Sequence, residues 1–139
     1  MKFTKGITLV CVLVFAGALT ACGGGGGKYS DLKPVVKKFN DTTETFINSM
    51  EKAEGADAVA AALNALAKEM KTIKAGMDKM EEKYPELKNM SDPPEELGAE
   101  AARMQELMGR MGTVMMKAMQ FGDDPKVMEA QKAFEEAMK

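Results

Sequence analysis

The residues of this chain whose type and spacing could do chemistry are its methionines. There are 14 of them in 139 residues, and six fall between positions 104 and 119. Spacings of three and four residues place side chains on one face of a helix, where thioether sulfurs could gather Cu(I), a soft ion that favours sulfur ligands. The candidate ligands are Met108, Met111, Met115, Met116 and Met119.

The competing interpretation is that most of these methionines fill a hydrophobic core. Met104, Met108, Met111 and Met115 fall on the apolar stripe of a predicted helix, where flexible thioethers occupy irregular gaps between helices. We favour core packing, since the chain has no histidine and no dense run of methionines expected to be exposed. Met116 and Met119, away from the centre of the stripe, could mark an adaptable patch for a partner. The same two lie within the Cu(I) set, so that alternative stays open.

A cysteine near the start of the chain indicates a different chemistry. Leu19-Thr20-Ala21-Cys22 closes an apolar run over 6–19 that follows two lysines. The run has the length of a signal-peptide core and is shorter than the roughly 20 residues that span a bilayer. The four closing residues resemble the lipobox of bacterial lipoproteins. This resemblance implies removal of residues 1–21 and lipidation of Cys22, whereas an ordinary secretory cleavage is the alternative.

The expected anchor decides where the protein works. Each buried CH₂ of an acyl chain contributes about 0.8 kcal/mol, and two or more chains give stable residence in a membrane. By resemblance to enteric sorting, Gly23 in place of Asp favours the outer membrane over the inner one. We expect a cell-envelope protein on the periplasmic face, held to the lipid bilayer through Cys22, with an unidentified envelope protein as its partner. A net charge of −2 with interspersed signs argues against nucleic acid.

The spacing of apolar residues after Cys22 predicts an all-α fold. Residues 22–29 form a glycine-rich tether, and residues 30–139 one domain with helices at about 31–54, 57–84, 93–121 and 125–138. Apolar positions alternate at spacings of four and three, as in helices that pack on each other. In the first three helices they are Leu32, Val36, Phe39, Thr43, Phe46, Met50 and Ala53; Val59, Leu63, Leu66, Met70, Ile73, Met77, Met80 and Tyr84; and Leu97, Ala101, Met104, Met108, Met111, Met115 and Ala118, widened by Leu107, Val114 and Phe121. In the fourth they are Val127, Gln131, Phe134 and Met138.

Capping residues and proline mark the helix ends. Ser30 or Asp31, Asp57, Asp92 and Asp124 are expected N-caps, the third in a capping box with Pro93 and Glu95. Gly55 is the expected C-cap of the first helix, Pro85 should end the second near Lys83, and Gly122 should end the third. Since connections are short, we predict an antiparallel up-down-up-down four-helix bundle.

Three groups of residues in the predicted helices carry a family resemblance. They are Asp31-Leu32 with Asn40-Asp41; Glu51-Lys52-Ala53 with Ala56, Val59, Ala62 and Leu63; and Lys126-Val127 with Glu129-Ala130-Gln131, Ala133 and Glu135. They resemble the first helix, the first helix-to-helix junction and the start of the fourth helix of the cytochrome b562 family. The proline-rich second loop also agrees. The resemblance covers most of 31–139 and implies a four-helix bundle.

The resemblance also implies a haem b site, which the residues do not complete. That family holds haem between a methionine in the first helix and a histidine near the end of the fourth. Aligned from Asp31-Leu32, the methionine position is Val36, and the chain contains no histidine. The stretch that would carry the histidine lies beyond Lys139. We therefore expect no haem, with ligation by methionine alone as the alternative.

The remaining polar residues do not predict an enzyme. Acidic pairs such as Glu81-Glu82 and Glu135-Glu136 suit solvated faces, and a Glu-x-x-His di-iron motif requires a histidine that the chain lacks. We find no nucleophile with a base, no phosphate loop and no nucleotide fingerprint. The expected function is a non-enzymatic interaction or accessory module, and the alternative is a cytochrome b562-like haem protein or a methionine-ligated copper protein.

Overall fold

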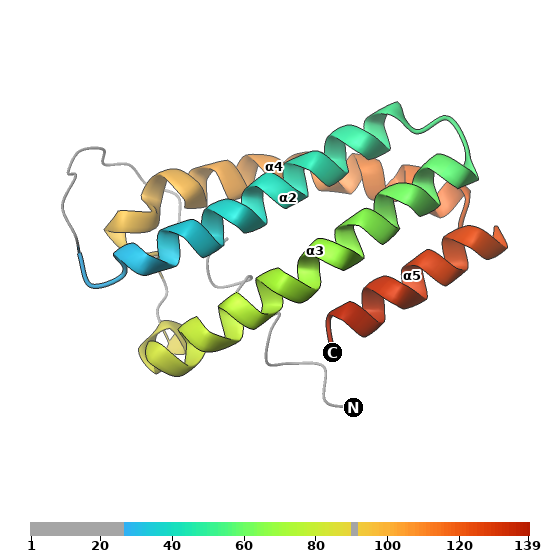
Figure 1. Ribbon diagram of the computed structural model, residues 1–139. Helices are drawn as coiled ribbons and strands as arrows, with labels where there is room; N and C mark the ends of the chain where they lie inside the picture. Colours follow the sequence, from blue (N-terminus) through green and yellow to red (C-terminus); the bar gives the residue numbers. More distant parts are fainter. Residues whose placement is uncertain (1–26, 90–91) are drawn as a thin grey trace.

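A computed structural model describes residues 27–89 and 92–139, and within these residues the protein is all-helical (Figure 1). The elements are η1 (Ser30–Leu32), α2 (Lys33–Lys52), α3 (Ala56–Lys83), η2 (Pro85–Asn89), η3 (Glu95–Leu97), α4 (Gly98–Gln120) and α5 (Pro125–Ala137). The four predicted helices are therefore present, and the all-α prediction is confirmed. The predicted signal peptide, Cys22 and most of the glycine tether lie outside the described residues. Among the described helices, none is long and apolar enough to cross a bilayer.

The helices form a bundle in which α2 and α3 are central. α2 packs on both α3 and α4, while the shorter α5 packs on α3. A helix with two neighbours must bury two rows of side chains. Accordingly, α2 buries most of the predicted seam and also Asn40 and Ile47, each 0% exposed, which a single seam does not include.

Most of the core is one cluster that joins all four helices, here called the main cluster. Its buried members are Phe46, Ile47, Met50, Ala53, Val59, Ala60, Ala62, Leu63, Leu107, Val114, Ala118, Val127 and Ala130. The small side chains of Ala60 and Ala130 suit a close approach of α5 to α3. Several of these alanines were absent from the predicted seams, because an apolarity pattern gives a short side chain little weight.

A second cluster closes the end of the bundle where α3 finishes and α4 begins. It contains Leu32, Val36, Tyr84, Leu87, Leu97 and Met104. The Tyr84 ring meets the Tyr29 ring edge-on at 5.2 Å between centroids, and its hydroxyl donates to Asp31 Oδ1 at 2.7 Å. Lys83 pairs with the same carboxylate. These contacts join the start of the described chain to the end of α3.

The helix ends differ from prediction where caps were expected from side chains. Asp124 caps α5 as predicted, accepting from the Lys126 amide at 2.9 Å, and α3 ends at Lys83. In contrast, α2 and α3 have no side-chain cap, and Gly55 is the N-cap of α3, not the C-cap of α2. The expected capping box is also wrong, because Pro94 is the N-cap of η3 and α4 itself begins at Gly98.

Candidate interaction surface

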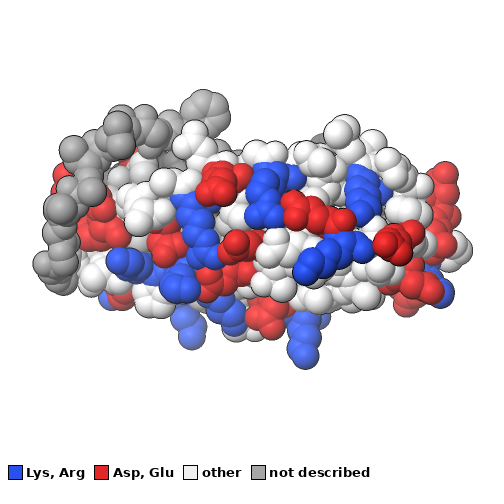
Figure 2. Space-filling view, turned by 90° about the horizontal axis from the view of Figure 1, so that it is seen from above, with Lys and Arg blue, Asp and Glu red and all other residues white. Residues whose placement is uncertain are grey.

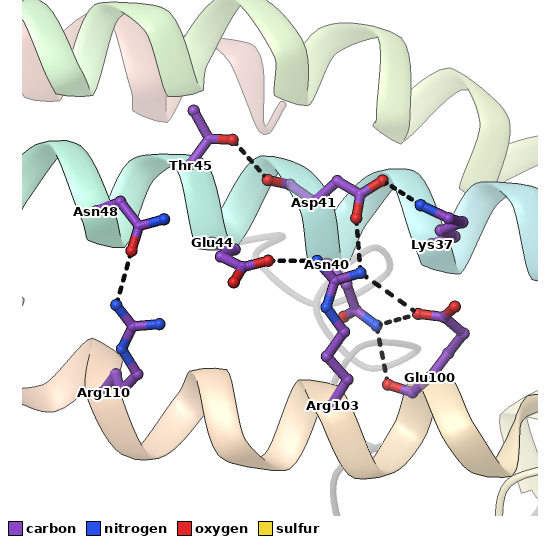
Figure 3. Close-up of polar contacts among 9 residues, drawn as sticks. All are labelled: Lys37, Asn40, Asp41, Glu44, Thr45, Asn48, Glu100, Arg103 and Arg110. Atoms are coloured by element: carbon purple, nitrogen blue, oxygen red, sulfur yellow. Dashed lines mark hydrogen bonds and ion pairs between the residues drawn. The ribbon is translucent and has the colours of Figure 1, made fainter.

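The three cations of helix α4 lie on the side that faces α2. Arg103, Arg110 and Lys117 follow each other at intervals of seven residues, so they lie in one row along the helix. In Figure 3 the two arginines reach across from α4 to side chains of α2. The row matches acceptors on α2 that are spaced by three and four residues: Asp41, Glu44, Asn48 and Glu51.

Each cation of this row has a partner on α2. Arg103 pairs with Glu44 and, at 2.6 Å between Nη1 and Oδ1, with Asp41. Arg110 donates through Nη2 to Glu51 Oε2 at 2.9 Å and to Asn48 Oδ1 at 2.8 Å. Lys117 Nζ donates to the Glu51 carbonyl oxygen at 2.9 Å. This ladder fixes the register of α4 against α2, and sequence reasoning missed it although the seven-residue spacing was available as a signal.

Beneath the ladder, a polar contact lies inside the helix interface. Asn40 Nδ2 donates to two oxygens of Glu100, the backbone carbonyl and Oε2, both at 2.8 Å (Figure 3). The Glu100 side chain is only 13% exposed, and its carboxylate lies 3.9 Å from Arg103 Nη1. Asn40 Oδ1 is buried and accepts no hydrogen bond from the described residues. A buried amide of this kind specifies one register, because any slip leaves its donors unpaired.

The ladder also changes the proton affinity of its groups. Hydrogen bonds from Lys37 and then from Arg103 lower the pKa of Asp41. Hydrogen bonds to Glu44 and Asp41 raise the pKa of Arg103. The groups lie at the surface, so solvent screens their attraction and each pair contributes little stability by itself. The ladder therefore acts mainly as a device for orientation.

The predicted methionine stripe of α4 is partly wrong. Met104 is buried and Met111 is half-buried against the main cluster, but Met108 and Met115 are 44% and 47% exposed. Because α4 packs chiefly on α2, the centre of its buried face lies along Leu107 and Val114, and this shift turns the next row of side chains outward.

The side of α4 away from the ladder is mostly uncharged and open to solvent, with the exposed Glu106 at its border. We call it the outer face and define it by Gly98, Ala101, Ala102, Gln105, Met108, Gly109, Gly112, Met115, Met116 and Met119. Met116 and Met119 are 64% and 75% exposed. A Cβ atom added at Gly98, Gly109 or Gly112 would meet nothing within 4 Å. In Figure 2 charged side chains gather along the middle of the view, and the upper edge, on the side of α4, is mostly white.

The three glycines of the outer face, Gly98, Gly109 and Gly112, do not serve packing within the described residues. Glycine in a helix interior costs about 1 kcal/mol relative to alanine. No other part of the described chain lies within 4 Å of a Cβ added at these glycines, so a close contact inside the chain does not offset their cost to helix stability. Four of the five large apolar side chains that are exposed in the described residues lie on this one helix. Exposed methionine is thus concentrated beside exposed glycine on one helix, and exposed apolar patches of this kind often take part in association.

The structure separates the predicted metal-binding methionines between the surface and the core. Of the five candidate sulfur ligands, Met108, Met115, Met116 and Met119 lie on the outer face, and Met111 turns into the core. In the described part of the chain, no group of three His, Cys, Asp or Glu residues is placed to hold a metal ion. The position that the family resemblance assigns to a haem ligand, Val36, is a buried apolar residue of the second cluster. The Val36 side chain has no atom that could ligate haem iron.

Comparison with known proteins gives no relative: no family model, no curated protein and no solved structure matches the chain.

Proposed function

We propose that this protein is a lipid-anchored, non-enzymatic helical bundle of the bacterial cell envelope that acts as an interaction module, with the outer face of α4 as its binding surface. The observation that carries the proposal is the division of α4 into two sides. One side commits Arg103, Arg110 and Lys117 to α2, and the other exposes methionine and glycine with the single acidic residue Glu106 at its border.

The chemistry of the outer face suits binding more than catalysis. Methionine is unbranched and polarisable, so a methionine surface adapts its shape to an apolar partner. Burying the face costs little in desolvation, because it contains one polar side chain, Gln105, and no charged one. The lipobox-like residues before the bundle support an anchor at Cys22, which would hold this surface close to a membrane.

Two measurements test the two parts of the proposal. Cells fed a labelled fatty acid should incorporate it into the chain, and the Cys22→Ala variant should not. Replacing Met116 and Met119 by Lys should abolish co-purification of envelope proteins with the full chain, while Lys71→Glu on the exposed side of α3 should preserve it. An unlabelled wild-type chain would refute the anchor, and co-purification that survives the Lys replacements would refute the binding surface.

A second candidate function is Cu(I) binding by methionine. The specific observation is that Met115, Met116 and Met119 are exposed within about one turn of α4, although Met115 was expected on the buried stripe. Thioethers spaced by three or four residues can share a soft ion. Stoichiometric Cu(I) uptake that disappears in the Met116→Leu, Met119→Leu variant would support it, because leucine preserves the apolar volume and removes the sulfur.

A further inference from the structure

We propose that the outer face of α4 binds the same face of a second copy of this chain, in an antiparallel α4–α4 pair whose twofold axis passes near Gly109. The inference rests on the proposed function, because it names the partner of that surface. It is argued from the spacing, the exposure and the sizes of the residues on the face.

The outer face contains a packing seam of its own. Seven positions follow each other at strictly alternating intervals of four and three residues, and every one of them is exposed: Gly98, Ala102, Gln105, Gly109, Gly112, Met116 and Met119. This alternation is the pattern of a helix that packs on another helix along its length. The row that packs on α2 occupies a different side of α4, so this seam is not covered by the described residues.

The sizes along the seam are arranged to complement themselves in reverse order. Before Gly109 the seam contains Gly98, Ala102 and the larger Gln105, and after it come Gly112 and the two methionines, Met116 and Met119. When two copies run antiparallel, each methionine therefore lies opposite a residue that leaves room for it. The facing pairs are Met119 with Gly98, Met116 with Ala102, Gly112 with Gln105, and Gly109 with Gly109 of the second copy.

The rows that flank the seam follow this rule in part. On one flank Met115 faces Ala101, and Met108 meets its own equivalent. On the other flank Glu106 faces Thr113, so the two acidic side chains are not opposed. The antiparallel pair thus brings no like charges together, and it leaves the ladder between α4 and α2 intact.

Other occupants match the face less well. A parallel pair would place methionine on methionine at one end and glycine on glycine at the other, which crowds the first and leaves a gap at the second. A helix that lies on anionic lipid typically borders its apolar face with lysine and arginine. The cations of α4 instead pair with α2.

The pair is compatible with anchoring of both copies in one membrane. The described chain begins at the end of the bundle where α4 starts, since a Cβ on Gly27 would collide with the Glu96 side chain. In the antiparallel pair the two starts lie at opposite ends of a seam about 32 Å long. A twofold axis perpendicular to the membrane places both starts at the same height above it.

Site-directed cross-linking of the full chain in bacterial membranes tests the register. A short bis-maleimide reagent is applied to Gly109→Cys, with the unmodified chain as the control for Cys11 and Cys22. Asn64→Cys, at an exposed position of α3, is the matched control. We expect Gly109→Cys to form dimer several-fold more efficiently than Asn64→Cys. Met108→Cys should behave like Gly109→Cys, which repeats the test without filling a glycine. Gly98→Cys and Met119→Cys should each give little dimer alone and abundant dimer when co-expressed.

Three outcomes would overturn the inference. Equal dimer yield from Gly109→Cys and Asn64→Cys would show that no second copy covers the face. Efficient dimers of Gly98→Cys alone would show a parallel pair. Cross-links from position 109 to a different protein would refute self-association and leave the proposed interaction module standing, whereas fatty-acid labelling reports on the anchor independently.

Discussion

Asn40 and Glu100 form a hydrogen-bonded pair inside the interface between α2 and α4, in which one amide nitrogen donates to both the carbonyl and the carboxylate of the same residue. Asn40 is fully buried, and its remaining oxygen has no partner among the described residues. The pair therefore stabilises the fold mainly because breaking it is costly. Without the Asn40 amide, the Glu100 carboxylate, which is 13% exposed, loses its closest hydrogen-bond donor.

Replacing Asn40 by Leu should lower the free energy of unfolding by about 1–3 kcal/mol, because the Glu100 carboxylate is left buried without a close donor. Urea denaturation followed by circular dichroism measures the change. Glu100→Gln is the matched control, since its amide oxygen still accepts from Asn40 and the expected change is smaller. If both variants unfold at the same urea concentration as the wild type, the buried pair has no role in stability.

The double variant Asn40→Leu, Glu100→Leu tests whether the loss of stability comes from leaving the Glu100 carboxylate unpaired. Replacing a buried polar pair by apolar groups is often neutral or stabilising, because neither partner remains unpaired. We expect the double variant to recover most of the stability lost in Asn40→Leu. A double variant that loses the sum of what Asn40→Leu and Glu100→Leu lose separately would mean that the two residues are not coupled, and that the loss in Asn40→Leu does not come from an unpaired carboxylate.

A larger side chain should destabilise the protein where α5 packs on α3, but not on the exposed side of α3. Ala130 is 0% exposed in the main cluster, so Ala130→Leu should cost about 1–3 kcal/mol by forcing the helices apart. Ala61 is exposed on α3, and Ala61→Leu should leave the unfolding free energy within about 0.5 kcal/mol of the wild type. Comparable losses at the two positions would contradict the close packing of α5 on α3.

The glycines of α4 give a prediction of opposite sign. A Cβ at Gly112 meets nothing within 4 Å, so Gly112→Ala should raise the unfolding free energy of the dilute protein by roughly 0.5–1 kcal/mol. At Gly122 the added Cβ would lie 3.2 Å from the Met119 carbonyl oxygen, and Gly122→Ala should bring no such gain. Thermal unfolding at low protein concentration measures both, and equal shifts in Tm would contradict the open outer face.

The sequence predicts the number, type and approximate position of the helices, because a four-three alternation of apolar residues is a property of each segment alone. It does not predict which helices are neighbours. Ile47 and Ala130 were missed since each faces a helix that local periodicity cannot identify. Met108 and Met115 were assigned to the core for the same reason: the buried side of α4 depends on where α2 lies.

The polar ladder shows the same division between local and tertiary information. The seven-residue spacing of Arg103 and Arg110 is visible in the sequence, and so is the spacing of the α2 acceptors. Only the structure aligns the two rows, because their register depends on loop geometry and on the Asn40–Glu100 contact. Surface charges that appeared interspersed and solvated thus form one ordered set.

Protonation of the ladder should weaken the fold in acid. Hydrogen bonds from Lys37 and Arg103 lower the pKa of Asp41 below its ordinary value of 3.8, so the unfolded chain binds the proton more tightly than the folded one. The contribution of Asp41 to stability is therefore fully present well above pH 3.8 and is lost as the pH falls through the lower folded pKa. Asp31, which pairs with Lys83 and Tyr84, follows the same sign because its pKa is also lowered.

The measurement is the difference in unfolding free energy between the wild type and Asp41→Asn, followed from pH 7 to pH 2 by urea denaturation. The wild type should be more stable at neutral pH, and the difference should shrink toward zero at the acidic end, because protonated aspartate and asparagine are alike in charge. Asp123→Asn is the control, since Asp123 is exposed between α4 and α5 and no ion pair connects it to the described residues. A difference for Asp41→Asn that is independent of pH would show that its ion pairs with Lys37 and Arg103 do not stabilise the fold, and that α4 is oriented on α2 by the buried contacts alone.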